Sequence, residues 1–229
     1  GGDDILLFAP VISNDIGIAT HIMELIQKID KKFSEYAAIL SDISGEDVSS
    51  FNQSYGITIS YFKFPLYESM NMAFNNLMFK AKNMRLNPKK NSVVVSMQKH
   101  SGQKWEFTLL KDSASDSNYN QWMNFVNNYC KGNHPESTFL NSLTHRIEML
   151  HPIFNSAKTI KDGIKSFFKK SFNDEPHKNN NFIEDLGAIC QHIYQLDCKK
   201  NSQMECLDKK SYIYSMLRYL DFINKEKED

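Results

Sequence analysis

Three side chains that could share a metal ion or relay a proton recur in one segment of helical character. His145, Glu148 and His151 follow each other at intervals of three residues. On a helix this spacing places them within a sector of about 120°. The zinc-protease arrangement differs, because it sets two His four residues apart with a Glu beside the first. We therefore expect a solvated helix face, with these three as candidate ligands only; the sequence predicts no metal site and no cofactor.

The four cysteines are spaced too widely for a zinc knuckle. They are Cys130, Cys190, Cys198 and Cys206, and the last three recur every eight residues. A tetrahedral zinc site instead takes pairs of thiolates two to four residues apart. A Cys198–Cys206 disulfide is one alternative, but we favour free thiols. This predicts a cytoplasmic protein or one delivered to a reducing cytosol, and no signal peptide opens the chain as given.

The sequence contains no complete arrangement for nucleophilic catalysis. Cys130 lies near His134 but lacks the Arg-terminated phosphate cradle of a Cys-dependent phosphatase. His100, Asp112 and Cys130 have the order found in some deubiquitinating proteases, without the accompanying Cys motif. Neither a P-loop nor a GxSxG element is present. Whether the chain is an enzyme stays open at this stage.

A glycine-containing turn follows the first apolar segment, Ile5–Phe8. Gly17 would let backbone amides approach a ligand, and a following helix N-terminus favours negative charge. The stretch from Ile5 through Gly17 to Leu25 resembles the opening of sugar-nucleotide glycosyltransferases of the GT-B fold. In that family an apolar strand runs into a glycine loop and a helix of the form G-I-A-x-H-x-x-x-L.

A second stretch, residues 153–164, is similar to a later element of the same family, in which a Ser begins a helix facing the interdomain cleft. The resemblance implies the acceptor-side half of a transferase, with a sugar nucleotide or an acceptor as its ligand. It implies a ligand site made of Asn14, Gly17, His21, His100 and Ser156. The family's donor-binding domain carries two Glu eight positions apart, and no Glu pair here has that separation. We therefore expect a glycosyltransferase-like domain that is not active alone.

The missing catalytic motifs also allow a second class of function. The alternative is a non-catalytic protein-interaction module, such as a secreted bacterial effector. In that case the helical half would dock a protein partner.

The elements that must position these residues change in kind along the chain. Before residue 112, apolar runs typical of buried strands alternate with helical periodicity, which predicts an α/β layer with a Rossmann-like, mostly parallel sheet. The expected strands are 5–8, 36–40, 57–64, 92–96 and 105–110, and the expected helices are 18–32 and 67–84. Residues 5–42 would form a βαβ unit.

After residue 112 every strong periodicity is helical. The expected helices are 119–130, 137–151, 156–172, 182–198 and 207–225, with breaks at Pro135 and Pro152, a polar connector at 113–118 and a loop at 173–181. We therefore expect an α/β sheet layer over 1–112 and a helical layer over 113–229 packed on it, as one compact unit. No segment is long and apolar enough to span a bilayer.

The charge of the chain limits which ligands it is expected to bind. The 229 residues carry 27 basic and 27 acidic side chains, and this zero net charge disfavours broad nucleic-acid binding. The balance hides an asymmetry, because residues 1–50 have a local charge of −6 and residues 80–111 a local charge of +7. In the basic segment lysines interleave with Phe79, His100 and Trp105, a composition that also suits single-stranded nucleic acid. We expect this segment to be a solvated face, and any anion to bind there.

Overall fold

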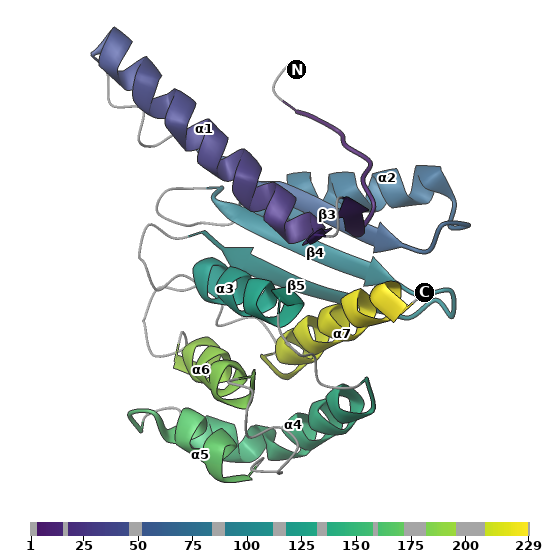
Figure 1. Ribbon diagram of the computed structural model, residues 1–229, viewed down its shortest axis with the longest axis vertical. Helices are drawn as coiled ribbons and strands as arrows, with labels where there is room; N and C mark the ends of the chain where they lie inside the picture. Colours follow the sequence, from purple (N-terminus) through teal and green to yellow (C-terminus); the bar gives the residue numbers. More distant parts are fainter. Residues whose placement is uncertain are drawn as a thin grey trace.

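The computed structural model describes residues 4–15, 18–45, 52–83, 90–111, 118–131, 137–157, 160–171, 182–195 and 209–228. These residues form a mixed α/β structure in which a three-stranded sheet is covered by helices, with a further layer of helices below (Figure 1). The predicted mixture of helices and a sheet is therefore confirmed.

The central sheet contains β3 (Tyr55–Ser60), β4 (Ser92–Gln98) and β5 (Lys104–Leu110) in the order β3-β4-β5. β3 and β4 are parallel, whereas β4 and β5 are antiparallel. All three strands were predicted within a few residues. The Rossmann-like, mostly parallel sheet is not confirmed, because one of the two strand pairs runs antiparallel and the tight turn at residues 99–103 leaves no room for a helical crossover.

The central strand β4 is buried on both faces. Val93, Val95 and Met97 belong to the main apolar core. The alternate residues turn to the other face, where Ser92 Oγ donates to the Ala81 carbonyl at 3.1 Å and Ser96 contacts Asn76. This two-sided burial explains why Val93–Val95 are consecutive apolar residues and why the serines on the second face have hydrogen-bond partners.

The connection between the parallel strands covers one face of the sheet. It consists of α2 (Leu66–Asn75), a π-helical turn (Asn76–Lys80) and a 3₁₀ turn (Ala81–Asn83). The π turn brings the buried Asn76 onto the sheet, where its Nδ2 donates to Ser96 Oγ at 2.7 Å and to the Ile57 carbonyl at 3.2 Å. Such turns insert one residue into a helix and redirect side chains.

The N-terminal segment differs most from the prediction. Ile5–Phe8 is not a buried strand, since these four side chains are 54–87% exposed and no described strand pairs with them. A short hairpin follows, made of β1 (Ile12–Asp15) and β2 (Ile18–His21). The expected βαβ unit over 5–42 is therefore wrong.

A single long helix, α1 (Ile22–Ser44), replaces the expected helix and the strand at 36–40. A short apolar run is compatible with either element, and no Gly or Pro interrupts residues 22–44. The helix ends at Gly45, whose φ of 70° is left-handed and whose N–H bonds to the Ser41 carbonyl. The second half of α1 projects away from the sheet (Figure 1).

The rest of the described chain is helical. Its helices are α3 (Asn118–Lys131), α4 (Ser137–Ala157), α5 (Gly163–Ser171), α6 (Phe182–Gln195) and α7 (Lys209–Glu228). The break expected at Pro152 is wrong, because α4 continues through it. Fully buried Phe154 lies just beyond and stacks on Phe168 at 5.4 Å, and this burial offsets the hydrogen bond that proline removes. The helix expected at 156–172 consequently starts later, at Gly163.

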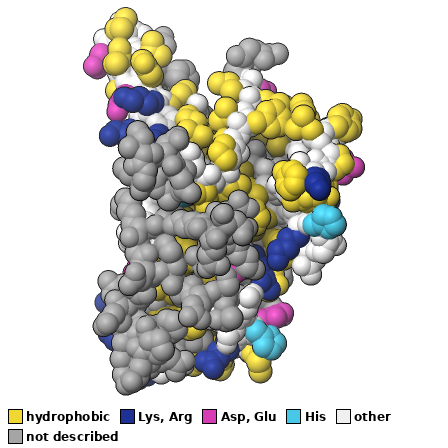
Figure 2. All heavy atoms as spheres, turned by 45° about the vertical axis from the view of Figure 1, so that its right-hand side comes forward, with side chains coloured by type: hydrophobic (Ala, Val, Ile, Leu, Met, Phe, Trp, Pro, Cys, Tyr) yellow, Lys and Arg dark blue, Asp and Glu magenta, His cyan; other side chains and the backbone are white. Residues whose placement is uncertain are grey.

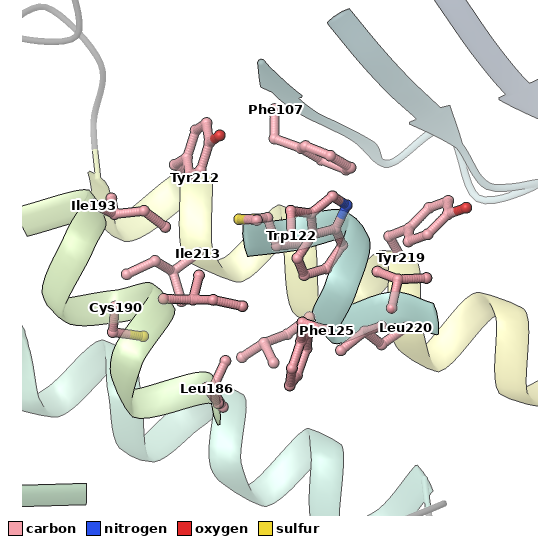
Figure 3. Packing of buried hydrophobic residues seen from close by; sticks show 14 of the residues in the cluster. Phe107, Trp122, Phe125, Leu186, Cys190, Ile193, Tyr212, Ile213, Tyr219 and Leu220 are labelled. Atoms are coloured by element: carbon pink, nitrogen blue, oxygen red, sulfur yellow. The ribbon is translucent and has the colours of Figure 1, made fainter. Parts of the chain in front are cut away.

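One aromatic cluster joins the sheet to the helices. Phe107 on β5 lies edge-on to Trp122 on α3 at 5.7 Å and to Tyr219 on α7 at 5.9 Å (Figure 3). Trp122 and Tyr219 are themselves 6.1 Å apart and fully buried. The same apolar core continues through α6, where Leu186, Cys190 and Ile193 extend it away from the sheet. The side of β5 that faces this core is thus covered by α3 and α7.

Candidate functional site

The residues predicted to bind a ligand are dispersed over the structure. Asn14 and His21 lie on the β1–β2 hairpin, and Gly17 lies outside the described residues. His100 lies in the turn between β4 and β5, and Ser156 lies near the end of α4, in the helical layer farthest from the sheet (Figure 1). The structure thus brings Asn14 and His21 together but leaves Ser156 apart. Their ligand-binding roles stay predictions.

Two of these residues have evident structural contacts. His21 is 4% exposed, and its Nε2 lies 2.9 Å from Asn127 Oδ1, so it ties the hairpin to α3. Ser156 does not begin a helix as expected. Its Oγ instead donates to the Pro152 carbonyl, one turn earlier in α4, at 3.1 Å. The N-cap prediction for Ser156 is wrong because α4 runs through Pro152.

The candidate metal ligands on α4 form pairwise contacts. His145 Nδ1 lies 4.0 Å from Glu148 Oε2 on an exposed face, and His151 Nδ1 contacts the Tyr194 hydroxyl. Within the ranges that the structure describes, no three His, Cys, Asp or Glu side chains are close enough to hold a metal ion. His151 is directed toward α6 rather than along the exposed face.

Cys190 is the cysteine whose side chain the structure describes. It is fully buried and free, and burial raises the pKa of its thiol. Such a thiol is inert at neutral pH. Cys198 and Cys206, with the disulfide considered between them, lie outside the described residues, as does the side chain of Cys130.

A partly buried charge cluster holds α1 on the sheet. The Asp30 carboxylate on α1 accepts hydrogen bonds from Tyr55 Oη at 2.7 Å and from Tyr119 Oη at 3.0 Å, and pairs with Lys111 Nζ at 2.7 Å. Burial, and then the Asp30 charge, raise the pKa of both phenols. Burial lowers the pKa of Lys111 although Asp30 opposes this shift. Every polar group here has a protein partner, so the cluster stabilises the fold.

An acidic group near the start of the chain contacts the basic segment. Asp4 Oδ1 lies 2.5 Å from Lys82 Nζ, on the 3₁₀ turn after α2, and both side chains remain partly exposed. Nearby in the sequence, Lys80 Nζ pairs with Glu106 Oε2 on β5 at 2.5 Å. Asp4 belongs to Gly1-Gly2-Asp3-Asp4, two glycines followed by two carboxylates. The sequence signal for this position is the run of two glycines and two carboxylates, and none of the ligand-site predictions included it.

The comparisons with known proteins give one positive finding. A protein-family model, Cas10/Cmr2, second palm domain, matches residues 1–94. No curated protein and no solved structure matches the chain. The matched stretch runs from the glycine pair through α1 and β3 to the first residues of β4, so it contains both Asp4 and Lys82. It ends before the helices α3–α7.

This finding overturns the expected function. The resemblance to GT-B glycosyltransferases is wrong, because residues 1–94 match a palm domain, a nucleotide-cyclase-like fold, and because the expected strand at Ile5–Phe8 is not formed. A transferase function and a sugar partner have no support. The alternative of a non-catalytic interaction module is not supported either. None of the described helices is both long and apolar enough to cross a membrane.

Proposed function

We propose that this chain contains a palm-type domain of the Cas10/Cmr2 kind, with a nucleotide-binding, cyclase-like function. The observation that carries the proposal is the family match over residues 1–94. The described arrangement supports it, since the matched stretch supplies β3, the helical connection packed on one face of the sheet and the start of β4. We likewise propose that the helical part from residue 113 on is a layer that covers this sheet.

The donor groups at the start of the matched stretch fit a magnesium-bound nucleotide. Adjacent carboxylates such as those of Asp3 and Asp4 would repel a bare phosphate. A Mg²⁺ ion would offset this repulsion, because Mg²⁺ is commonly bound by one or two carboxylates together with the phosphate oxygens of a substrate. Glycines in front of the carboxylates allow a phosphate to approach the backbone. An ion held by these carboxylates would neutralise phosphate charge and polarise the phosphoryl group.

Lys82 supplies the complementary charge. Its ammonium already lies against Asp4 at 2.5 Å, and its side chain is 26% exposed, so it is held in place rather than free in solvent. A lysine acts on phosphate as a point charge. In this proposal Lys82 positions Asp4 in the unbound protein and contacts the nucleotide's phosphates when a nucleotide binds.

The first prediction follows from these contacts. Replacing Asp4→Asn removes one carboxylate of the pair, and we expect the affinity for ATP in the presence of Mg²⁺ to fall at least tenfold, measured by isothermal titration calorimetry. Lys82→Ala should weaken binding to a similar extent. Because the Asp4–Lys82 pair is partly exposed, neither change should alter the unfolding midpoint in urea appreciably.

Matched controls separate this site from a general charge effect. Asp42→Asn on the exposed part of α1 and Lys169→Ala on α5 make the same charge changes at exposed positions elsewhere. Both controls should bind Mg²⁺-ATP like the unaltered chain. If the unaltered chain binds no nucleotide with Mg²⁺, or if Asp42→Asn weakens binding as much as Asp4→Asn, the proposal is wrong.

A further inference from the structure

Helix α1 carries one apolar stripe along its whole length. The stripe residues recur at alternating intervals of four and three, the heptad spacing that lets one helix pack along another. They are Ile22, Ile26, Ile29, Phe33, Tyr36, Leu40 and Ile43. The stripe thus continues to the end of a helix of 23 residues.

The body of the protein covers only the first half of this stripe. Ile26 is 4% exposed and belongs to the main core, and Asp30 still contacts the sheet. Beyond Asp30 the exposed fraction of the stripe residues rises to 66% at Tyr36, 54% at Leu40 and 77% at Ile43. The heptad pattern therefore continues past the point where the body stops covering the helix.

We call residues 33–44 the α1 arm. The arm projects away from the sheet (Figure 1), and Figure 2 shows hydrophobic side chains at its free end. A helical segment of this length spans about 18 Å and is only marginally stable in water by itself. Ile39, which is 52% exposed, widens its apolar face. A second helix packed on this face would remove these side chains from water and stabilise the arm.

The arm of a second copy of the chain fits this face. When two arms pair antiparallel about a two-fold axis at residue 38, Phe33 of each copy lies opposite Ile43 of the other, and Tyr36 lies opposite Leu40. Each stripe residue of the arm then has an apolar partner. Ala37, next to the centre of the stripe, is small and allows the two backbones to approach each other.

The charges along the helix favour the same orientation. Lys32 lies just before the arm, and Asp42 lies near the end of the arm. Antiparallel pairing brings the basic start of each arm to the acidic end of the other, whereas parallel pairing would bring like charges together. The chain has no net charge, so long-range repulsion between two copies is weak.

The area of the apolar face limits the strength of the contact. Covering Tyr36, Ile39, Leu40 and Ile43 would remove roughly 500 Å² of surface from water in each copy, or about 1,000 Å² in a pair, which is the lower limit for a specific interface. We therefore expect a reversible dimer with a dissociation constant of roughly 1–100 μM.

We propose that the α1 arm binds the α1 arm of a second copy, giving a two-fold symmetric dimer held by an antiparallel helix pair. A lipid surface fits the arm less well, because helices that lie on membranes carry Lys and Arg on their polar face. The charged residues of the arm, Glu35 and Asp42, are both acidic. The pairing uses no residue of the proposed nucleotide site, so its test does not depend on the proposed function.

The first test is sedimentation velocity of the full chain between 1 and 100 μM. We expect the mass to rise with concentration from the 26.5 kDa of one chain towards twice that value. Leu40→Lys places a charge in the middle of the helix pair and should raise the dissociation constant at least tenfold. Leu40 is half exposed in a single copy and lysine is a good helix former, so far-UV circular dichroism should show an intact fold.

The matched control is Met149→Lys, which makes the same charge change at a 70% exposed apolar position of α4. It should dimerise like the unaltered chain. The inference is wrong if the chain stays monomeric at 100 μM, or if Leu40→Lys dimerises as well as Met149→Lys. It is also wrong if a monomeric chain co-sediments with phosphatidylcholine vesicles and Leu40→Lys abolishes that binding.

The second test concerns the orientation of the two arms. Antiparallel pairing puts Tyr36 of one copy opposite Leu40 of the other, so a mixture of the Tyr36→Cys and Leu40→Cys chains should form a disulfide-linked dimer under mild oxidation. Each variant alone should form no more of it than the unaltered chain, as judged on a non-reducing gel. Cross-linking of each variant alone, without an increase in the mixture, would indicate parallel arms and overturn the antiparallel pair.

Discussion

Two carboxylates, those of Asp30 and Asp4, differ in how many protein partners they have and in how exposed they are. The Asp30 side chain is 22% exposed and contacts three polar side chains, whereas the Asp4 side chain is 43% exposed and pairs with Lys82. A carboxylate with several protein partners helps to hold a fold together, and a more exposed one with a single partner remains available to a ligand. This difference, rather than residue type, separates the structural cluster from the candidate site.

The buried cluster gives a stability prediction. Asp30→Asn keeps the shape of the side chain but leaves the ammonium of Lys111, whose side chain is 10% exposed, without its counter-charge. We expect the free energy of unfolding in urea to fall by about 3 kcal/mol. Asp42→Asn, at an exposed position of the same helix, should change it by less than about 0.5 kcal/mol. Equal stability of the two variants would show that the cluster does not hold α1.

The buried phenols predict a loss of stability at high pH. The pKa values of Tyr55, Tyr119 and Tyr212 are raised by burial, so the folded state keeps protons that the unfolded chain releases above about pH 10. The unfolded state then binds fewer protons, and the free energy of unfolding falls as pH rises. Lys111 opposes this, because its lowered pKa makes the folded state bind fewer protons. Because three tyrosines favour a loss of stability and one lysine opposes it, we expect a net loss of stability as the pH rises.

Urea midpoints measured at pH 8, 9.5 and 10.5 test the sign. We expect the midpoint to decrease from pH 9.5 to 10.5, and Tyr119→Phe to decrease less over the same interval because one raised phenol is gone. A midpoint that increases with pH would mean that the lysine dominates.

Several residues that matter in the structure could be noticed in the sequence, but their contacts could not be predicted from it. His21 was predicted as a ligand-binding residue, and the structure adds its contact with Asn127, which lies 106 residues away in the chain. Only the folded chain brings that partner close. Conversely, Asp3 and Asp4 are adjacent carboxylates in the sequence, and their proposed role follows only once residues 1–94 are matched to a palm domain.

At the scale of elements, β3, β4 and β5 were predictable because strands of a buried sheet are apolar, β-branched and bounded by turn residues. The segment 36–40 was not, because five apolar residues fit a strand or a helix equally well, and the decision depends on the helix that precedes them. Pro152 was misread as a break since the burial of Phe154, a tertiary effect, decides that α4 continues.

The close contact between β3 and its crossover gives an element-scale prediction. A Cβ added at Gly56 would lie 2.4 Å from the Leu77 nitrogen and 2.5 Å from the Ala73 oxygen, both backbone atoms. Gly56→Ala must therefore push α2 and the π turn off the sheet. We expect a loss of about 1–3 kcal/mol or more in the free energy of unfolding.

Gly45→Asn is the control for that change. Gly45 has open space around it, and asparagine tolerates its left-handed φ of 70°. This variant should lose less than about 1 kcal/mol. A Gly56→Ala protein as stable as the unaltered chain would contradict the close packing of α2 on β3.

Across the whole molecule, the apolar core runs from the sheet through α3 and α7 into α6 without interruption. On the surface, exposed apolar side chains are concentrated in one region. Figure 2 shows a large hydrophobic area over the upper part of the molecule, with Lys, Arg and His side chains at its lower edge. The exposed side chains of Ile5–Phe8 and of the second half of α1 are part of the apolar surface of the chain. The division at residue 112 stays a prediction.

The continuous core predicts that the sheet and the helices unfold together. Tyr219→Ala on α7 removes a fully buried ring that contacts both Phe107 and Trp122, and we expect a loss of about 3–5 kcal/mol. Tryptophan fluorescence, which reports on β5 and α3, and far-UV circular dichroism, which reports on all helices, should shift to lower urea by the same amount. Met149→Ala, at a 70% exposed position, should leave both transitions in place. Two separated transitions would contradict a shared core.

The position of α7 also affects how the protein is made. β5 is complete at Leu110, but Tyr219, on the helix that covers Phe107, follows more than 100 residues later. At a synthesis rate of about 5–20 residues per second, roughly 5–20 s pass between the two events on the ribosome. Throughout that time the aromatic face of the sheet lacks its last cover. We therefore expect the nascent chain to expose this apolar face to chaperones until α7 emerges and covers it.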